Sequence, residues 1–272
     1  MEAGREVGHN VYPLPTLDQI ISVDNSRFLK RLHPRPDAVI PRIGVGLSSF
    51  GQILISAFEQ ADIPVTTSSF GLMNSRDKFL SGQYLADHGI SVPKTLTFAN
   101  AYNMDAAIRA VGGYPFILKK LKGTQGSAVF LINDVDLAHK KLGKYMRKRK
   151  PFLIQEYIKE SNGSDLRCFV VGGKVVAAMR RTAADGDFRA NIHAGGSGSA
   201  VKLSPEEHDM AVRVTELLKL PVAGDDILQS NKGPLLLEVN SSPGLQGIEK
   251  ATGKDIAAEI IRYIESMVHK NG

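Results

Sequence analysis

Short apolar runs broken by turn residues recur along the chain, and this pattern predicts strands. Runs with the length of buried strands cover residues 115–121, 128–132 and 152–158. Residues 166–181 carry two apolar arms around Gly172-Gly173-Lys174, and a second hairpin is predicted around Asn231-Lys232-Gly233. We therefore expect several strands joined by tight turns.

Helices are predicted between these strands, where apolar residues recur at helical spacing. The segment rich in lysine and arginine that precedes the strand at 152–158 is expected to form a basic helix. Another helix opens at Ser204-Pro205-Glu206-Glu207, which has the pattern of a capping box with proline in the first turn. The remaining helices are expected over residues 49–61, 74–88, 104–111 and 254–269.

The first part of the chain has a less regular pattern. A buried strand is predicted at 37–46 and a short strand at 63–66, on either side of the helix at 49–61. Ahead of them, residues 5–12 resemble the end of a helix, a glycine cap and a strand. Because an α/β unit normally begins with a strand, we expect the first strand to be missing or degenerate.

Composition excludes several classes of protein. With 272 residues, 43% of them hydrophobic, the chain is long enough to bury a sizeable core and is neither disordered nor collagen-like. No apolar stretch approaches the roughly 18 residues needed to span a bilayer, and the first residues do not form a secretory signal. The single cysteine, Cys168, excludes a disulfide scaffold and fits a reducing cytoplasm; we expect it to be buried rather than nucleophilic.

The positive charge is concentrated in one segment. The chain has 34 Lys and Arg against 28 Asp and Glu, a net charge of +6, and residues 140–150 carry seven cations and no acid. Six minus seven leaves −1 for the rest of the chain. The segment is consistent with a solvated helix face, or with a docking surface for an acidic polypeptide or phosphate. Nucleic acid is less favoured, because no aromatic-interleaved basic motif accompanies it.

Two carboxylates and an amide are expected to meet on the second hairpin. If Asn231-Lys232-Gly233 form its loop, Asp226 faces Glu238, and Asn240 shares the face of Glu238 because side chains alternate along a strand. Hard oxygen ligands of this kind suit Mg²⁺ or Mn²⁺. The alternative is a salt-bridged surface hairpin, which the apolar run Leu235-Leu236-Leu237 makes less attractive.

Cations near two loops suit phosphate or carboxylate groups. Lys119 is expected to project from a strand that leads into a Gly-rich turn, whose backbone N–H groups would add donors; a plain turn is the alternative. Arg180, Arg181 and Arg189 flank another Gly-rich loop and suit a transferring phosphoryl group, a carboxylate substrate or salt bridges. The sequence contains no Gly-x-Ser-x-Gly elbow and no paired histidine spacing for zinc.

Five strings in order carry a resemblance to a known family. They are Arg76-Asp77-Lys78, Lys119 with Gly123-Thr124-Gln125-Gly126, Gln155-Glu156-Tyr157-Ile158-Lys159-Glu160, Gly186-Asp187-Phe188-Arg189-Ala190-Asn191-Ile192-His193, and Glu238-Val239-Asn240-Ser241-Ser242-Pro243-Gly244-Leu245. Over roughly residues 37–267 the chain resembles the ATP-grasp superfamily, specifically the RimK-like α-L-glutamate ligases that modify a small-subunit ribosomal protein.

The resemblance implies the fold and its division. The expected class is α+β, an ATP-grasp fold that holds the nucleotide between two α+β subdomains, preceded by a shortened α/β N-terminal domain. The N-terminal domain would cover residues 1–72, the central helix and lid subdomain 73–157, and the C-terminal subdomain with the metal site 158–272.

The resemblance also implies roles for individual residues. Lys78 and Lys119 would hold the nucleotide phosphates, Glu156 and Tyr157 would offer backbone groups to adenine, and Asp165 would bind ribose. The full nucleotide set would add Gly123, Thr124, Gln125, Gly126, Ser127, Gln155, Ile158, Arg189, Ala190 and Asn191. The catalytic residues would be Arg181, Arg189 and Asn191, and two Mg²⁺ or Mn²⁺ ions would be held by Asp226, Glu238 and Asn240.

The activity implied by the resemblance is ATP-dependent ligation of a carboxylate to the amino group of L-glutamate through an acylphosphate. The implied acceptor is an acidic protein or peptide tail, such as that of a small-subunit ribosomal protein. A small-molecule or amino-group carrier acceptor, and a non-catalytic ATP-binding regulator, are the alternatives. The chain would be a cytoplasmic homo-oligomer, a tetramer by resemblance, without membrane or direct nucleic-acid contacts. The family's pattern has an arginine where this chain has Thr182, so contacts with the acceptor carboxylate are expected to differ.

Overall fold

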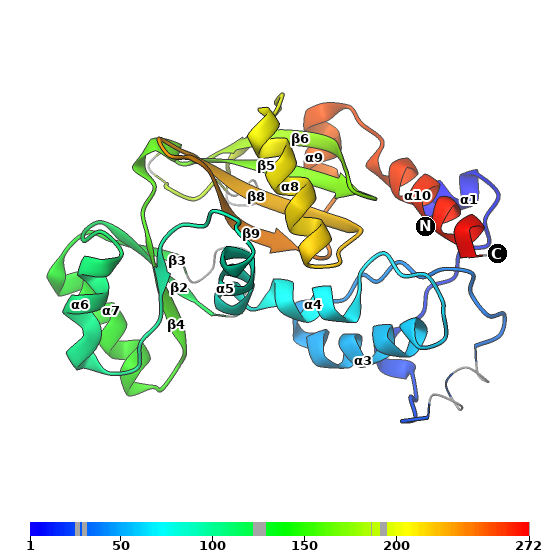
Figure 1. Cartoon of the computed structure of the whole chain (residues 1–272), viewed down its shortest axis with the longest axis horizontal. Helices are drawn as coiled ribbons and strands as arrows, with labels where there is room; N and C mark the ends of the chain where they lie inside the picture. Colours follow the sequence, from blue (N-terminus) through cyan, green and yellow to red (C-terminus); the bar gives the residue numbers. More distant parts are fainter. Residues whose placement is uncertain (25–27, 29–31, 122–128, 186, 191–194, 272) are drawn as a thin grey trace.

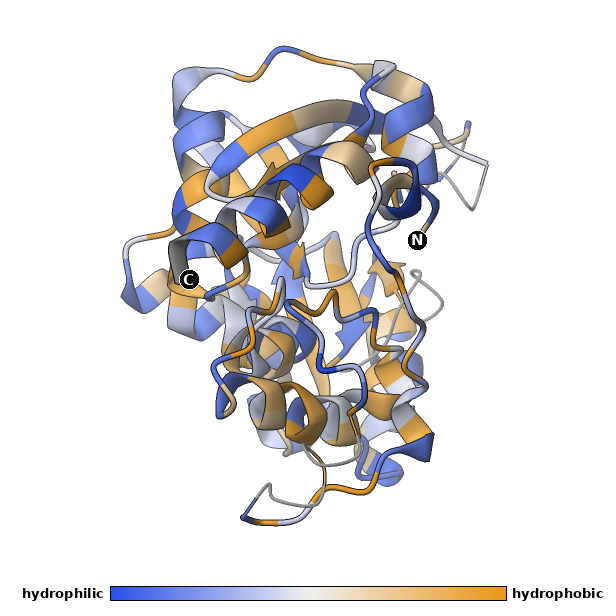
Figure 2. Cartoon of the chain, turned by 90° about the vertical axis from the view of Figure 1, so that its right-hand side faces the viewer, coloured by the Kyte–Doolittle hydropathy of each residue, from blue (hydrophilic) through white to orange (hydrophobic). Residues whose placement is uncertain are grey.

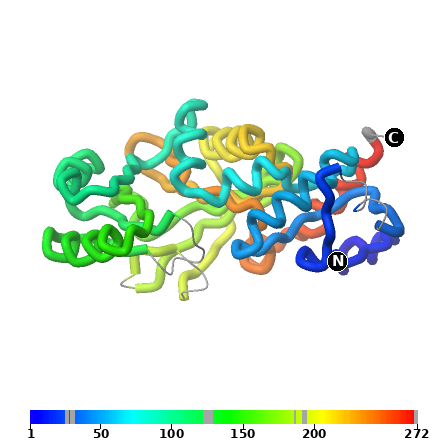
Figure 3. The backbone as a smooth tube through the Cα atoms, turned by 90° about the horizontal axis from the view of Figure 1, so that it is seen from below, coloured from blue at the N-terminus to red at the C-terminus, as the bar shows by residue number. Residues whose placement is uncertain are grey.

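The predicted segments assemble into two antiparallel sheets with helices packed on them, as a computed structural model of the chain shows (Figure 1). The structure describes residues 1–24, 28, 32–121, 129–185, 187–190 and 195–271. The molecule is elongated, with α6 (Met104–Ala110) and α7 (Val135–Arg147) near one end and both termini near the other (Figure 3). The α+β class expected from the sequence is confirmed.

The N-terminal region is helical and lacks the strands predicted for it. It contains α1 (Glu2–Glu6), the 3₁₀ turns η1 (Thr16–Asp18) and η2 (Val45–Leu47), α3 (Ser48–Glu59) and α4 (Ser69–Arg76). The prediction of strands at 37–46 and 63–66 is wrong. Among the described residues, these segments share only one parallel bridge, between Val39 and Val65.

A proline explains why this bridge does not grow into a ladder. The N–H of Val39 donates to the carbonyl of Pro64 (2.8 Å), and the N–H of Thr66 donates to the carbonyl of Val39 (3.2 Å). The next donor in a parallel ladder would be residue 41, which is a proline and has no N–H. The carbonyl of Thr66 accepts instead from the N–H of Val222 (3.2 Å), so this segment is tied to the C-terminal sheet.

The central subdomain is a four-stranded antiparallel sheet with two helices on one face. Its strands are β1 (Thr95–Leu96), β2 (Phe116–Lys120), β3 (Val129–Ile132) and β4 (Phe152–Glu156), in the order β1-β4-β2-β3, and η3 (Ala101–Asn103) precedes α6. From α7, Ala138, Leu142 and Tyr145 face the sheet at helical spacing, so the polar positions of this helix face outward. The predicted strands and the basic helix are thereby confirmed.

The C-terminal subdomain is a five-stranded antiparallel sheet in the order β7-β6-β5-β8-β9. The predicted capping box is present: the hydroxyl of Ser204 accepts from the N–H of Glu207 (3.2 Å), whose carboxylate accepts from the N–H of Ser204 (2.8 Å). The elements are η4 (Lys159–Ser161), β5 (Ser164–Val171), β6 (Lys174–Thr182), β7 (Ser197–Ala200), α8 (Pro205–Leu217), β8 (Val222–Ser230), β9 (Gly233–Asn240), α9 (Gln246–Thr252) and α10 (Ile256–Asn271).

Side-chain alternation along β5 divides the two faces of this sheet. Leu166, Cys168 and Val170 point to the face covered by α8, where they belong to one apolar cluster. On the other face, Phe169 and Val171 pack against α9 and α10. The first half of β5 on this face carries the polar residues Asp165 and Arg167, which the described residues of α9 and α10 do not cover. In Figure 2 the helices carry hydrophobic and hydrophilic residues side by side, as expected for helices with one face on a sheet.

The helix predicted at 74–88 is two helices, because Asp77 interrupts it. The carboxylate of Asp77 accepts from the N–H groups of Phe79 and Leu80, both at 3.1 Å, and so caps α5 (Lys78–Asp87) just after α4 has ended. The domain boundary predicted at 72/73 falls inside α4, and the one at 157/158 falls between β4 and η4. Across the described residues, no helix combines the length and hydropathy needed to cross a bilayer.

Among the described residues, the C-terminal sheet contains one buried acid without a hydrogen-bond partner. Asp225 of β8 is 0% exposed on the face covered by α8, and within the described part of the chain neither carboxyl oxygen has a hydrogen-bond partner. Burial raises the pKa of Asp225 well above its ordinary value. Asp225→Val should therefore increase the free energy of unfolding by about 1–3 kcal/mol, because it removes an unpaired polar group from the core. Urea denaturation monitored by circular dichroism measures this.

Asp225→Asn serves as the matched control for this substitution. It removes the charge but leaves a buried amide, so its gain in stability should be smaller than that of Asp225→Val. A Val variant less stable than the wild type would show that the carboxyl group is satisfied in solution.

Candidate active site

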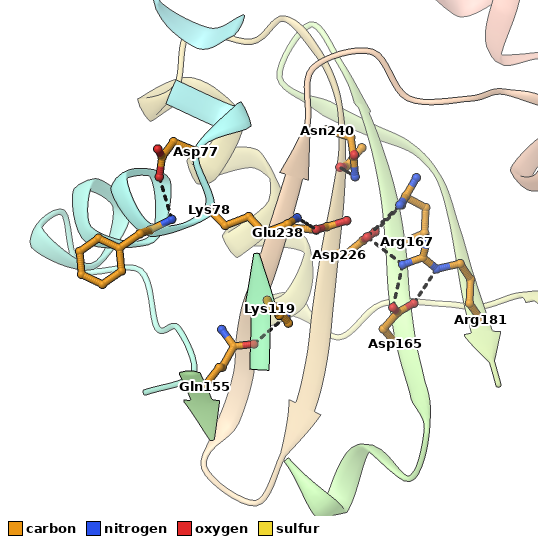
Figure 4. A network of polar contacts seen from close by, with 12 residues as sticks. Asp77, Lys78, Lys119, Gln155, Asp165, Arg167, Arg181, Asp226, Glu238 and Asn240 are labelled. Atoms are coloured by element: carbon orange, nitrogen blue, oxygen red, sulfur yellow. Dashed lines mark hydrogen bonds and ion pairs between the residues drawn. The ribbon is translucent and has the colours of Figure 1, made fainter. Parts of the chain in front are cut away.

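Charged side chains line the polar half of one face of the C-terminal sheet, and the strand register sets them in rows. Asp165 of β5 lies opposite Arg181 of β6. Arg167 of β5 lies opposite Asp226 of β8, which in turn lies opposite Glu238 of β9. Because residues two apart on a strand share a face, all five side chains come to the same surface (Figure 4).

The pairing of Asp226 with Glu238 is confirmed, although its local cause differs from the prediction. The hairpin turn has two residues rather than three, since Ser230 pairs directly with Gly233. This register alone would bring residue 237 opposite Asp226. A β-bulge between Asp226 and Ile227 shifts the register by one residue, and Glu238 takes that position.

Two arginines neutralise the most buried of these carboxylates. Asp226, whose side chain is 2% exposed, accepts from Nε and Nη2 of Arg167, the latter at 2.8 Å. Nη2 of Arg181 lies 2.8 Å from Oδ2 of Asp226, while Nε and Nη2 of the same guanidinium donate to Asp165, both at 2.7 Å. Arg181 therefore bridges the two aspartates, and both arginines hold a carboxylate in the bidentate geometry that fixes its orientation.

Burial and mutual charge tune these groups. Burial, together with the charge of Asp226, raises the pKa of Asp165 to about 6, although Arg181 opposes this rise. Burial would lower the pKa of Arg181, but Asp226 and Asp165 outweigh it, so the pKa of Arg181 is raised. The two arginines thus remain charged and hold the aspartates in place.

Arg167 is a site residue that the sequence analysis missed. It lies within the first apolar arm of the hairpin predicted at 166–181, and no role is predicted for it. The signal was available in β5, where Asp165 and Arg167 alternate with Leu166 and Cys168, so the two polar residues share one face.

Lys78 reaches the sheet from the start of α5. Its ammonium contacts the carboxylate of Glu238, 160 residues away in the sequence (Figure 4). Desolvation acts to raise the pKa of Glu238, but Lys78 and then Lys119 outweigh it and lower the pKa to about 2. Glu238 is therefore a stable carboxylate beside two lysines. The cap formed by Asp77 places Lys78 in the first helical turn, where it can make this contact.

Lys119 of β2 enters the site from the central sheet. It is 8% exposed, and its ammonium donates to Oε1 of Gln155 (2.7 Å), whose amide donates to the hydroxyl of Thr95 (2.8 Å). Burial, and then the charge of Lys78, lower the pKa of Lys119 to about 8. The side chain of Gln155 thus holds the ammonium of Lys119, whose charge interacts with Lys78 and Glu238.

The oxygens of Asp226, Glu238 and Asn240 fit a divalent cation bound together with a substrate. Asn240 follows Glu238 on the same strand face, and its amide nitrogen donates to the carbonyl of Gly224 (3.4 Å). Among the described residues, no three acidic, histidine or cysteine side chains gather as a metal cage. Two carboxylates and an amide leave positions for phosphate oxygens and water, which is how Mg²⁺ is usually bound beside a nucleotide. The assignment of these three ligands stays a prediction.

The structure places the other predicted residues away from this charge network or outside its described part. Arg189 and Ala190 lie in the loop after β6, where Arg189 pairs with Asp187 (2.7 Å) and lines a hollow beside β3. Arg180 points to the opposite sheet face and donates to Gln229 (2.8 Å). Glu156 ends β4, and Tyr157 and Ile158 connect it to η4. Outside the described residues lie Gly123, Thr124, Gln125, Gly126, Ser127 and Asn191.

Cys168 is not available as a nucleophile. It is 0% exposed beneath α8, and burial raises the pKa of its thiol. The buried role predicted for it is confirmed. The face carrying Asp226 and Glu238 therefore offers charged side chains rather than a thiol nucleophile.

Comparisons with known proteins agree on one family. Residues 75–264 match the model of the RimK-like ATP-grasp domain. A Cellvibrio japonicus protein named probable alpha-L-glutamate ligase is 49% identical over 229 residues, covering 84% of this chain and 76% of that protein. A Pseudomonas paraeruginosa protein of the same name is 44% identical over 276 residues, covering 100% of this chain and 90% of that protein.

Solved structures show the same fold. The ATP-grasp ligase PsnB, in complex with a minimal precursor, matches with a TM-score of 0.76 and 23% identity, covering 98% of this chain and 93% of that one. An ATP-grasp RimK domain protein from Sphaerobacter thermophilus matches with a TM-score of 0.73 and 21% identity, covering 96% and 92%. The family match covers well over half of the chain, and the relatives are similar over most of its length. This chain therefore belongs to the RimK-like ATP-grasp family.

Proposed function

We propose that this chain is an ATP-dependent α-L-glutamate ligase that adds glutamate to the terminal carboxylate of an acidic protein or peptide tail, for which a small-subunit ribosomal protein is the leading candidate. The observation that carries the proposal is the convergence of Lys78 and Lys119, from two different elements, beside Glu238 and Asp226. Two ammonium groups beside carboxylates that can bind a metal ion suit a nucleoside triphosphate. The names of the relatives support glutamate as the amine substrate.

The proposed reaction proceeds in two displacements. An oxygen of the acceptor carboxylate attacks the γ-phosphorus of ATP, the bond to the bridging oxygen breaks, and ADP leaves. The amino group of glutamate then attacks the acyl carbon of the acylphosphate, and the carbon–oxygen bond to phosphate breaks. An amide, inorganic phosphate and one proton result. No protein nucleophile is needed, which is consistent with the burial of Cys168.

The side chains would act by binding and neutralising charge. Lys78 and Lys119 would hold phosphate oxygens, and Arg167 and Arg181 would keep Asp226 and Asp165 in fixed orientations. A divalent cation held by Asp226, Glu238 and Asn240 would supply neutralisation of the charge on the transferring phosphoryl group.

The first test is a ligation assay. With ATP, Mg²⁺, L-glutamate and a peptide that ends in glutamate, we expect ADP to form together with peptides that have gained glutamyl residues, measured by coupled ADP detection and mass spectrometry. Glu238→Gln should reduce this activity by about 100-fold or more, because it removes a carboxylate that would hold the divalent cation and that pairs with Lys78. Circular dichroism checks that the variant is folded.

Two outcomes would contradict the proposed reaction. ADP formed at the same rate without any acceptor would remove the acylphosphate step, and ATP binding without turnover on any acceptor would favour a regulatory protein. Ligation confined to a small molecule or to an amino-group carrier protein would overturn the acidic-tail acceptor.

The orienting role of Arg167 is tested by a conservative change. Arg167→Lys keeps the charge but loses the bidentate hold on Asp226, so the apparent affinity for Mg²⁺ in the ligation assay should fall about 10–100-fold. Titration of Mg²⁺ at saturating ATP measures it. Arg180→Lys is the matched control on the opposite face of the sheet and should leave the Mg²⁺ dependence unchanged. An equal loss of apparent Mg²⁺ affinity in both variants would show that the changes act only through the stability of the sheet.

The lowered pKa of Lys119 predicts how ATP binding depends on pH. Only the charged ammonium attracts phosphate, so above pH about 8 each ATP bound must take up a proton. The affinity for ATP without metal should be constant between pH 7 and about 8, then fall by up to about tenfold per pH unit. Fluorescent ATP analogues in EDTA measure it. Lys119→Gln should bind weakly with no such slope, whereas Lys120→Gln should keep the wild-type profile; a slope that survives in Lys119→Gln would assign the proton to another group.

A further inference from the structure

The outer face of α7 carries cations that the proposed site does not use. Lys140, Lys144, Arg147 and Lys148 are exposed on one side of the helix, opposite the residues that pack on the sheet. In the described part of the chain, no ion pair involves any cation between residues 140 and 150. We call these four side chains the α7 basic face. No acidic side chain of the described residues pairs with it.

The guanidinium of Arg147 lies beside Gly143 on the surface of α7. A Cβ placed on Gly143 would lie 3.3 Å from Nη1 of Arg147, so the guanidinium lies against the helix at this position. Arg147 is exposed, three residues from Lys144 and seven from Lys140, which are about one and two turns of the helix. The basic face is a continuous strip along the helix.

Lys141, on the same helix as the strip, lines a hollow next to the loop after β6. Beside the outer edge of β3, a cavity of about 450 Å³ is lined by Lys141 of α7 and by Phe188 and Arg189 of the loop after β6. The ammonium of Lys141 lies 3.9 Å from the ring centre of Phe130, which holds it at the wall. The central and C-terminal subdomains each contribute a cation to this hollow, Lys141 and Arg189.

The spacing along α7 matches an extended acidic peptide. Residues four apart on a helix are separated by about 6 Å along its axis, which is the distance between successive members of Lys140, Lys144 and Lys148. In an extended peptide, side chains on the same side are about 6.6 Å apart. Glutamates on one side of an extended chain can therefore each meet one lysine. Nucleic acid is less well matched, because the strip consists of cations alone, without the stacking rings that hold single strands.

The proposed reaction makes such a peptide. Joining glutamate to a terminal carboxylate consumes one carboxylate and the positive ammonium, and it leaves the α- and γ-carboxylates of the new residue. The acceptor gains one negative charge and again ends in a carboxylate, so each product is chemically a further substrate. A basic surface that retains this product lengthens the tail before it dissociates.

We propose that the α7 basic face, with Lys141 at the hollow, binds the glutamate tail of the acceptor as it grows and keeps it on the enzyme between additions. This inference rests on the proposed function for the identity of the tail, but the binding itself requires neither ATP nor turnover. The surface acts on retention of the acceptor rather than on the chemical step.

The test replaces the four side chains of the α7 basic face by glutamine. Binding of a fluorescently labelled oligoglutamate peptide, measured by anisotropy, should weaken about tenfold or more, and its dependence on salt should flatten. In the ligation assay, mass spectrometry should show fewer glutamates per acceptor, while the rate of the first addition at saturating acceptor stays unchanged. The control replaces Lys174, Lys202, Lys232 and Lys254 by glutamine; these are exposed cations elsewhere, and the net charge changes equally.

The outcomes separate this inference from the proposed function. Equal weakening in both variants, or an unchanged peptide affinity and product length in the α7 variant, overturns the α7 basic face as a tail-binding surface. Tighter binding of a single-stranded RNA of equal charge through the same four residues overturns it in favour of nucleic acid. Peptide binding that depends on the α7 basic face, without any ligation, supports the tail-binding surface and contradicts the proposed ligase activity. If the fourfold variant does not fold, the single change Lys144→Glu gives the same readout.

Discussion

Charge compensation across the face of the C-terminal sheet is the constraint on which the site depends. A charge taken out of water is costly unless a partner and hydrogen bonds replace the solvent. Asp226 is 2% exposed, yet it contacts both Arg167 and Arg181, and Arg181 also holds Asp165. These pairs form only if β5, β6 and β8 keep their register. The site therefore requires the sheet, and removing Arg181 would take from the buried Asp165 the arginine that holds it.

The same strands supply both the site and the surface that stabilises it. On β5, Asp165 and Arg167 are followed on the same face by Phe169 and Val171, which α9 and α10 cover. Burial of Phe169 and Val171 holds β5 in place. This also positions Asp165 and Arg167, although no apolar cluster of the described residues covers them. Loops would not hold bidentate ion pairs as firmly, because their backbone is less constrained. The bulge beside Asp226 completes the arrangement by bringing Glu238 into line.

Much of this was accessible from the sequence, and the failures have physical causes. Period-two alternation was enough to pair Asp226 with Glu238, although the shorter turn and the bulge had to offset each other. The N-terminal strands were overpredicted because apolar residues near Pro41 resemble a strand while the ladder lacks a donor. The contact of Lys78 with Glu238 spans 160 residues, so no local pattern contains it. Only the resemblance to a family indicated that Lys78 belongs to the site.

The positive charge of the chain acts in two physically different ways. Arg167 and Arg181 are largely buried and already paired, so their role is orientation, and salt in solution hardly screens them. The cations of α7 are exposed, so they attract an anionic partner over about 8–10 Å at ordinary ionic strength, and they do so weakly and reversibly. Weak binding suits a tail that must shift by one residue after each addition. The groups that bind the transferring phosphoryl group must instead keep fixed positions. The buried, paired arginines therefore serve the chemical step, and the exposed cations of the α7 basic face serve to retain the acceptor.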